Sequence, residues 1–435
     1  MNIFLFTFVV VFYLLGLTYV HKKFLNPINI IILWWSFWLC LSFSGFTDLF
    51  IPDDYVTFLV FLMLTGLFVG SVLSIRKVKN ISESRCLQRN DLYIARVYRL
   101  FIKTYRYVFI VIIYYFLKAM YIILTEGVSG YRGMTFSDGD NEGILFGHSY
   151  IEIMYGLIVS PYVLFFLFFG VYLYMSKNIK FVFIISSLMI ILESSMRLGR
   201  FGLYYVVIVL GIGFIISKYN YRTRYLKRKI IKISVIFLAL IVVIGGVREN
   251  NTLNTFYKSV FEYHTVGFVL FNNQLINEDS KLNQNISYGR GTLGGIGYLS
   301  TLVIRRFVPD YNSYYSSIVG DHHLAVQTGV NKEGLPIYHN AFYTMLFPLY
   351  SDGRELTVFF IPLLFGFAIS RSYQIYRKTL DAYHYMIILL IMFMFIFSLF
   401  LSMIGSHILF ISFLYLYLSN KFIFFKNKNA KISKL

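Results

Sequence analysis

Apolar runs long enough to cross a membrane recur along most of this sequence. About eleven such runs, within a range of roughly ten to twelve, lie near residues 2–20, 28–46, 55–75, 107–125, 149–174, 181–196, 201–217, 233–247, 355–370, 383–402 and 406–419. A hydrocarbon layer about 30 Å thick requires roughly 20 apolar residues in a helix. Lipid offers backbone groups no hydrogen-bond partner, so these runs predict an all-α integral membrane protein, a polytopic bundle.

One long polar stretch, residues 248–338, interrupts the apolar runs. Hydrophobic residues make up 57% of the chain and charged residues only 14%, so a polar stretch of this length is exceptional here. We therefore divide the chain into a transmembrane bundle of about eight helices over 1–247, a large loop with amphipathic helices over 248–338, further transmembrane helices over 339–420, and a basic tail over 421–435.

The basic residues lie mostly in one set of loops. Placing 21–26, 76–106, 175–180, 218–232, 371–382 and 420–435 on one side collects 28 of the 40 Lys and Arg there. The positive-inside rule makes this side cytoplasmic, which puts the loop 126–148, a tip near 196–200 and the stretch 248–338 outside. Topology explains the basic clusters, so we expect no nucleic-acid partner.

Arginines on the outer side depart from this charge rule. Glu193, Arg197 and Arg200 share one helical face at the outer end of a predicted span. Two interpretations stay open. The guanidinium groups hold a phosphate, with Glu193 orienting one of them, or the three residues form a self-satisfied ion cluster at the interface.

The outer stretch carries a second group of polar and aromatic candidates. Arginine beside tyrosine suits a ligand with phosphate at one end and sugars along its length, whereas amphipathic helices on a membrane surface would show the same mixture. We favour ligand binding for the set Arg248, Arg290, Arg305, Arg306, Asp321, His322, His323, Tyr314, Tyr315 and Asn340.

Two motif matches in this stretch do not carry the chemistry that they suggest. Gly289, Gly291 and Gly294 match G-x-G-x-x-G, but no βαβ unit surrounds them, so we expect a glycine-rich turn that positions Arg290. His322 and His323 are adjacent and would point apart, and no metal-ligand spacing completes a site around them. We therefore expect no metal.

His339 lies where the outer stretch returns to the membrane. A histidine at that position can accept a proton near neutral pH, as activation of a sugar hydroxyl requires. An interfacial histidine that is hydrogen-bonded to backbone would look the same in the sequence.

The segment His339–Thr344, continuing to Tyr350–Gly353, resembles the conserved stretch of bacterial Wzy-type O-antigen and capsule polymerases. The layout is similar over most of the chain, with ten or more spans, an outer arginine turn in mid-sequence and a large outer loop before the last three spans. Arg200 with Gly211 eleven residues later matches the family's first catalytic loop. The second loop departs from the family, because no glycine stands eleven residues after Arg248, Arg290, Arg305 or Arg306.

The resemblance implies a GT-C-like membrane glycosyltransferase that works without a metal or other cofactor. It would polymerise undecaprenyl-pyrophosphate-linked oligosaccharide repeat units of O-antigen or capsule at the outer, periplasmic face of the bacterial cytoplasmic (inner) membrane. The growing glycan would pass to the non-reducing end of a new lipid-linked unit. Membrane lipids and a chain-length regulator protein are the other expected partners.

Residue roles follow from the same resemblance. Arg200 and Arg197 would hold the diphosphate, with Arg290, Arg305 or Arg306 completing the clamp. His339 would be the general base, with Glu193, Asp321 and His322 as rivals.

Two other functions share parts of this pattern. An O-antigen ligase would use the same donor and a lipid A core acceptor. A flippase for the lipid-linked unit would instead show two matching halves and charged groups along a midplane path, and neither pattern stands out here.

Overall fold

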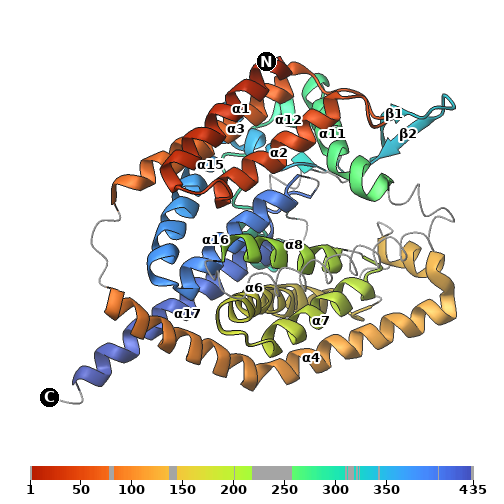
Figure 1. Cartoon of the computed structure of the whole chain (residues 1–435). Helices are drawn as coiled ribbons and strands as arrows, with labels where there is room; N and C mark the ends of the chain where they lie inside the picture. The colour runs from red at the N-terminus through yellow and green to blue at the C-terminus, as the bar shows by residue number, and fades with distance from the viewer. Residues whose placement is uncertain are drawn as a thin grey trace. The chain divides into compact units, whose positions relative to one another are not determined.

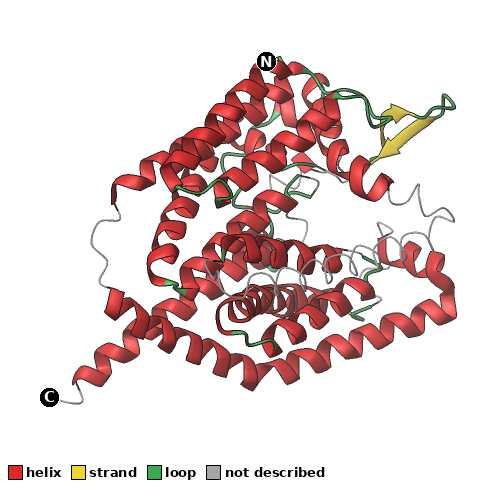
Figure 2. Cartoon of the chain, viewed as in Figure 1, coloured by secondary structure: helices red, strands yellow, loops and turns green. Residues whose placement is uncertain are grey.

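The computed structural model describes residues 2–77, 83–136, 145–199, 201–217, 257–308, 311, 318–319, 322, 324–340, 343–399 and 401–432. Within these ranges the chain is mainly helical, with one small β-hairpin (Figure 2). This confirms the predicted mostly helical, membrane-type architecture at the level of helix content.

The first half of the chain is a succession of apolar helices (Figure 1). They are α1 (Ile3–His21), α2 (Pro27–Phe43), α3 (Asp54–Leu73) with the 3₁₀ turn η1 (Ser74–Lys77), α4 (Glu83–Phe136), α5 (Ser149–Met154), the π-turn η2 (Tyr155–Val159), α6 (Ser160–Lys177), α7 (Phe181–Met196) and α8 (Phe201–Ile216).

The second half contains shorter elements before it returns to long helices. These are the π-turn η3 (Lys258–Glu262), α11 (Tyr263–Ile276), α12 (Lys281–Gln284), α13 (Gly294–Ile304), the antiparallel strands β1 (Val326–Val330) and β2 (Pro336–His339), α15 (Leu346–Thr379), α16 (Ala382–Phe397) and α17 (His407–Ile432).

Helix length and composition support membrane insertion. Within the described part of the chain, 5 helices are long and apolar enough to cross a membrane: Ile3–His21, Asp54–Leu73, Arg89–Tyr131, Tyr150–Lys177 and Leu346–Thr379. Shorter apolar helices occupy Pro27–Phe43, Phe181–Met196, Phe201–Ile216 and Ala382–Phe397, where the sequence predicted further spans. The predicted span 233–247 lies outside the described residues.

The chain divides into two compact units. Unit 1 comprises Met1–Ile81, Val242–Ile375 and Leu390–Phe410, and unit 2 comprises Ser82–Ile241, Tyr376–Leu389 and Ile411–Leu435. In unit 1, the indole nitrogens of Trp34 and Trp35 donate to the carbonyl oxygens of Ile396 and Phe395, at 3.1 Å and 2.9 Å. These bonds join α2 to the last turn of α16.

The polar stretch 248–338 contains a buried helix that the sequence did not predict. We expected amphipathic helices there, but residues 264–272 of α11 are all buried, and α11 packs against α2. The segment VGFVLF within α11 is apolar on every side, as is typical of a buried helix. The sequence did not indicate this helix because the surrounding stretch is polar on average.

Glycines bring α3 and α15 into direct backbone contact in unit 1. A Cβ atom added at Gly66 or Gly70 would overlap the carbonyl oxygens of Phe359 or Leu363, and one added at Gly366 would overlap that of Leu67. Gly66 and Gly70 form a G-x-x-x-G pattern, which allows two helix backbones to approach in an apolar environment. Close packing of this kind replaces the hydrophobic effect, which cannot drive helices together inside lipid.

In unit 2, α6 is the central helix. Every residue from Ser160 to Met175 is buried. Gly170 permits α7 to pack closely, since an added Cβ atom would lie 2.7 Å from the Cα atom of Phe183. A helix that is apolar all round is typical of the middle of a bundle.

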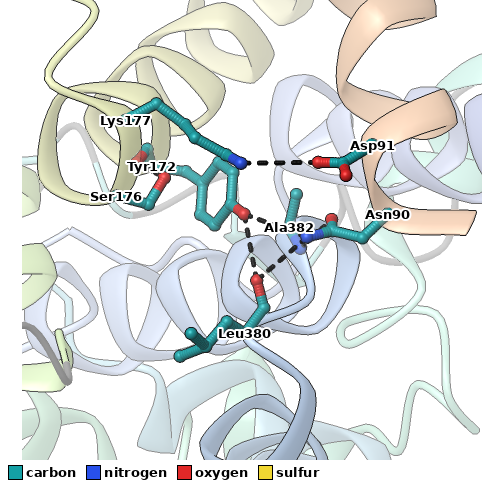
Figure 3. A network of polar contacts seen from close by, with 7 residues as sticks. All are labelled: Asn90, Asp91, Tyr172, Ser176, Lys177, Leu380 and Ala382. Carbon is teal, nitrogen blue, oxygen red and sulfur yellow. Dashed lines mark hydrogen bonds and ion pairs between the residues drawn. The ribbon is translucent and has the colours of Figure 1, made fainter. Parts of the chain in front are cut away.

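A polar network closes the turn between α15 and α16 (Figure 3). Asn90 of α4 donates to the Leu380 carbonyl at 3.2 Å and accepts from the Ala382 amide at 2.9 Å. The Tyr172 hydroxyl of α6 donates to the same Leu380 carbonyl at 3.0 Å. Leu380 has a left-handed backbone with φ 53°, so this turn depends on partners from α4 and α6.

Replacement of Gly70 by alanine should disrupt the contact between α3 and α15. The added methyl group meets backbone that cannot move aside, so we expect a loss of about 2 kcal/mol or more in the free energy of unfolding. Gly211→Ala in α8 is the matched control, because nothing lies within 4 Å of a Cβ atom added there. Thermal unfolding of the purified protein in detergent measures both, and equal midpoints for the two variants would contradict this packing.

Replacement of Asn90 by alanine should destabilise the turn at Leu380. The change leaves the buried Ala382 amide without its acceptor, which costs about 1–3 kcal/mol. Asp91→Asn on the same helix removes only the exposed 3.4 Å ion pair with Lys177, and exposed pairs contribute about 0–1 kcal/mol. The unfolding midpoint should therefore fall more for Asn90→Ala than for Asp91→Asn, and the reverse order would refute the role of the network.

Candidate functional site

A buried carboxylate in unit 1 holds the turn that precedes α13. Asp352, near the start of α15, is only 4% exposed. It accepts hydrogen bonds from the Ser287 hydroxyl, from the amides of Gly291 and Thr292, both at 2.7 Å, and from the Thr292 hydroxyl at 2.6 Å. A carboxylate has about four acceptor positions, so these donors saturate it.

Arg354 holds the preceding part of the same segment. Its guanidinium group donates to the carbonyl oxygens of Leu282 and Asn283, both at 2.7 Å, and of Asn285 at 3.3 Å. Arg354 has a left-handed backbone with φ 57°, which costs a non-glycine residue about 1–2 kcal/mol. Charge-assisted hydrogen bonds to three carbonyls offset this cost. Together, Asp352 and Arg354 fix residues 282–292 against α15.

The three glycines of the G-x-G-x-x-G match serve this close packing. Gly289 has φ +88°, in the left-handed region. A Cβ atom added at Gly291 would lie 2.9 Å from Asp352 Oδ1, and one added at Gly294 would lie 2.8 Å from the Gly405 carbonyl oxygen. The segment is therefore a glycine-rich turn, as the sequence indicated.

Arg290, Arg305 and Arg306 lie along this turn and the helix that follows it. Arg290 stands between two of the glycines and is exposed. Arg305 and Arg306 follow the end of α13 and are also exposed, and the Arg305 Nε atom donates to the Tyr311 carbonyl at 2.8 Å. The turn fixed by Asp352 thus leads directly into a helix that ends in two arginines.

The exposed face of α13 and its flanking turns is mostly apolar, with Ser300 as an exposed polar side chain on it. Leu293, Ile296, Val303 and Phe307 recur at helical spacing and are 45–79% exposed. The opposite face packs within unit 1, where the Tyr298 ring stacks on the His407 ring with centroids 4.3 Å apart. An apolar face that ends at arginines is typical of a helix at a membrane surface.

His339 is the last residue of β2. Its Nδ1 atom lies 2.7 Å from the Thr328 hydroxyl on β1, and that hydroxyl also lies 3.2 Å from the Ile337 carbonyl, to which it donates. Either the Nδ1 atom or the hydroxyl can be the donor in the shorter of these two contacts. In the tautomer with the proton on Nδ1, the lone pair of the neutral imidazole lies on Nε2, the atom that a general base would use. Asn340 follows and is exposed.

His322 lies in an aromatic cluster. Its ring stacks on Tyr343 with centroids 3.7 Å apart and meets Phe347 edge-on at 4.2 Å. The imidazole packs here as an aromatic ring, a role that the sequence analysis did not predict.

Glu193 and Arg197 belong to unit 2 and have different partners. Arg197, directly after α7, forms an ion pair with Glu152 of α5 at 3.5 Å and lies over the Phe146 ring. Glu193 accepts a hydrogen bond from the Ser160 hydroxyl at the start of α6. Arg197 is thus ion-paired with Glu152, which the sequence analysis did not connect with it, and it also interacts electrostatically with Glu193. Both contacts agree with the interpretation that carboxylates of this protein neutralise Arg197.

The remaining predicted residues lie outside the described part of the chain. They are Arg200, Arg248, Tyr314, Tyr315, Asp321 and His323. In the ranges that the structure describes, no group of three or more His, Cys, Asp or Glu side chains could hold a metal ion.

Asp352 and Arg354 are the residues whose importance the sequence did not reveal. Asp352 lies in the segment that resembles the polymerases, but the sequence alone indicated no role for Asp352 or for Arg354. The available signal was the sequence S-D-G-R-E interrupting an otherwise apolar helix, since charged groups at such a position need partners.

No protein family, curated protein or solved structure compared with this chain matches it. The resemblance to Wzy-type polymerases therefore depends on the segments 339–344 and 350–353 and on the layout of the apolar runs.

Asp352→Ala should release the glycine-rich turn. It leaves the amides of Gly291 and Thr292 without their acceptor, whereas the Thr292 and Ser287 hydroxyls keep contacts with the Gly289 carbonyl and the Ser351 hydroxyl. Each unpaired amide costs about 1–3 kcal/mol, so we expect a loss of about 2 kcal/mol or more in the free energy of unfolding. Asp279→Ala removes an exposed carboxylate from the same region as a control. Limited proteolysis between residues 281 and 293, together with the unfolding midpoint in detergent, reports the change. If the Asp352→Ala variant resisted proteolysis as well as the wild-type protein does, the carboxylate would not be what fixes the turn.

Proposed function

We propose that this protein is a metal-independent glycosyltransferase that polymerises undecaprenyl-pyrophosphate-linked oligosaccharide repeat units at the outer face of the bacterial cytoplasmic membrane. The observation that carries the proposal is the arrangement of α13. An exposed apolar face on this helix leads to Arg305 and Arg306, and the turn that carries Arg290 precedes it. A polyprenyl diphosphate has the matching parts, an apolar chain and two phosphates.

In the proposed reaction, a hydroxyl of the acceptor unit attacks the reducing-end carbon of the growing glycan. The bond between that carbon and the diphosphate oxygen breaks, and the diphosphate leaves with its negative charge. Guanidinium groups suit this charge because they are permanently protonated and donate in a planar fork. Arg290, Arg305 and Arg306 are the described candidates, and Arg200 is the further candidate from the sequence.

His339 is the proposed general base. Its contact with Thr328 positions the imidazole ring, and the tautomer with the proton on Nδ1 would leave Nε2 to accept the hydroxyl proton of the acceptor. Arg197 is a weaker candidate for binding the diphosphate than its sequence position suggested, because the ion pair with Glu152 partly neutralises its positive charge. Glu193 stays a rival base, and its bond to Ser160 orients the carboxylate.

The proposal is tested by the glycans of a deletion strain that carries single variants. Arg290→Ala, Arg305→Ala, Arg306→Ala and Arg200→Ala should each shorten or abolish long chains while single capped units persist, with losses of about tenfold or more for a residue that stabilises the leaving group. Arg→Lys at the same positions keeps the charge but not the fork and should restore activity only in part.

Lys332→Ala is the matched control, because Lys332 is an exposed cation in the loop between β1 and β2. Each variant is compared at equal abundance in the membrane. Unchanged chain length in all four arginine variants would overturn the proposed role of the arginines. Loss of all capped core in the deletion strain would instead indicate the ligase, and accumulation of lipid-linked units on the cytoplasmic side would indicate the flippase.

A further inference from the structure

The first part of α4 has two distinct faces. One face packs within unit 2 and is formed by Asn90, Tyr93, Ile94, Val97 and Phe101, all of them buried. Phe101 contacts the Phe166 ring of α6 at 4.9 Å, and Asn90 belongs to the network in Figure 3. This face fixes the orientation of the helix, so the outward direction of its other side chains follows.

The opposite face carries a basic stripe, which consists of Arg89, Arg96, Arg99, Lys103 and Arg106. At 100° per residue these side chains lie within an arc of about 100°. Arg89, Arg99, Lys103 and Arg106 are exposed, and Arg96 is partly exposed. Asp91 is the single acidic residue between 89 and 106, and it forms an ion pair with Lys177. The stripe therefore keeps a strong positive charge.

Apolar side chains are interleaved with the basic stripe. Leu92 is 39% exposed, Leu100 is 50% exposed and Ile102 is 39% exposed. Basic residues alone suit an acidic protein or an anionic lipid equally well. Exposed leucine and isoleucine among them favour lipid, because these side chains can enter the boundary between headgroups and acyl chains while the cations stay at the phosphates.

The length of α4 supports the same occupant. The backbone is non-helical at Gly127, so the continuous helix from Arg89 ends there and is about 57 Å long at 1.5 Å per residue, nearly twice the hydrocarbon thickness. Its apolar part continues directly from the stripe through the exposed residues Tyr107, Ile110, Tyr114 and Leu117. Asn90 and Thr104 contact Tyr172 and Tyr162 of the apolar helix α6, so this part of α4 follows a predicted membrane span and its outward face meets lipid.

We propose that residues 89–106 of α4 bind the anionic phospholipid headgroups of the cytoplasmic leaflet through the basic stripe, whose long side chains extend to the headgroups. The negative surface potential of that leaflet attracts clustered Lys and Arg beside a membrane span, and the attraction weakens as salt screens it. The surface is independent of the proposed glycosyl transfer, because it lies on the side that the charge rule assigns to the cytoplasm.

A fluorescent probe at Leu100 tests the proposal in the full-length protein. In a Cys40→Ser, Cys86→Ser background, Leu100→Cys is labelled with a polarity-sensitive dye and reconstituted in phosphatidylcholine vesicles with or without phosphatidylglycerol. We expect emission to shift to shorter wavelength with phosphatidylglycerol and to return at high salt. Replacing Arg96, Arg99, Lys103 and Arg106 by glutamine should abolish the shift, whereas Arg→Lys at the three arginines should preserve it.

Two other probe positions serve as controls. Tyr114→Cys, on the exposed apolar part of α4, should report an apolar environment in both vesicles, and Lys332→Cys, in the hairpin loop, should report water in both. The proposal would be overturned if the emission wavelength at position 100 were the same with and without phosphatidylglycerol. It would also be overturned if the glutamine variant showed the same wavelength shift. The same shift produced in detergent by an acidic polypeptide would overturn it too, because the stripe would then be a protein-binding surface.

Discussion

Backbone groups that emerge where helices end or bend need polar partners inside an apolar protein, and this requirement shapes both units. In water such groups are solvated, but in lipid or in a helix bundle an unpaired one costs several kcal/mol. The chain meets the requirement with single side chains that serve several backbone groups. Asn90 serves both sides of the turn at Leu380, Asp352 serves two amides and two hydroxyls, and Arg354 serves three carbonyls. Each of these side chains joins segments that are far apart in the sequence.

The sequence predicted apolar helices because their signal is local, and 5 helices in the described ranges are long and apolar enough to cross a membrane. A run of about 20 apolar residues is sufficient evidence for a spanning helix, whatever lies elsewhere in the chain. The glycine-rich turn was also predictable, since three glycines in six residues favour a tight backbone. The buried helix α11 and the hairpin β1–β2 were not predicted. Both lie in a stretch that is polar on average, and their burial or pairing depends on distant partners such as α2 and Leu49.

The candidate site shows the same division between local and distant signals. Position in the sequence was enough to mark Arg290, Arg305 and Arg306, and they are exposed along one continuous segment of unit 1. Partners were not predictable. Arg197 is paired with Glu152, from a different helix, although Glu193 is nearer in sequence. Spacing along one helix shows which residues share a face, but the opposing helix decides which of them is neutralised.

The glycine contact between α3 and α15 has a mechanical consequence. Two helix backbones in van der Waals contact at Gly66, Gly70 and Gly366 have no side-chain layer between them that could rearrange. Sliding or rotation of one helix along the other would drive carbonyl oxygens into α-carbons, so the pair moves as a single rigid strut. The backbone is non-helical at Gly353 and Arg354, so this rigid pair begins after that bend and does not include Asp352. Any movement within unit 1 that the proposed transfer requires would have to come from elements other than this helix pair.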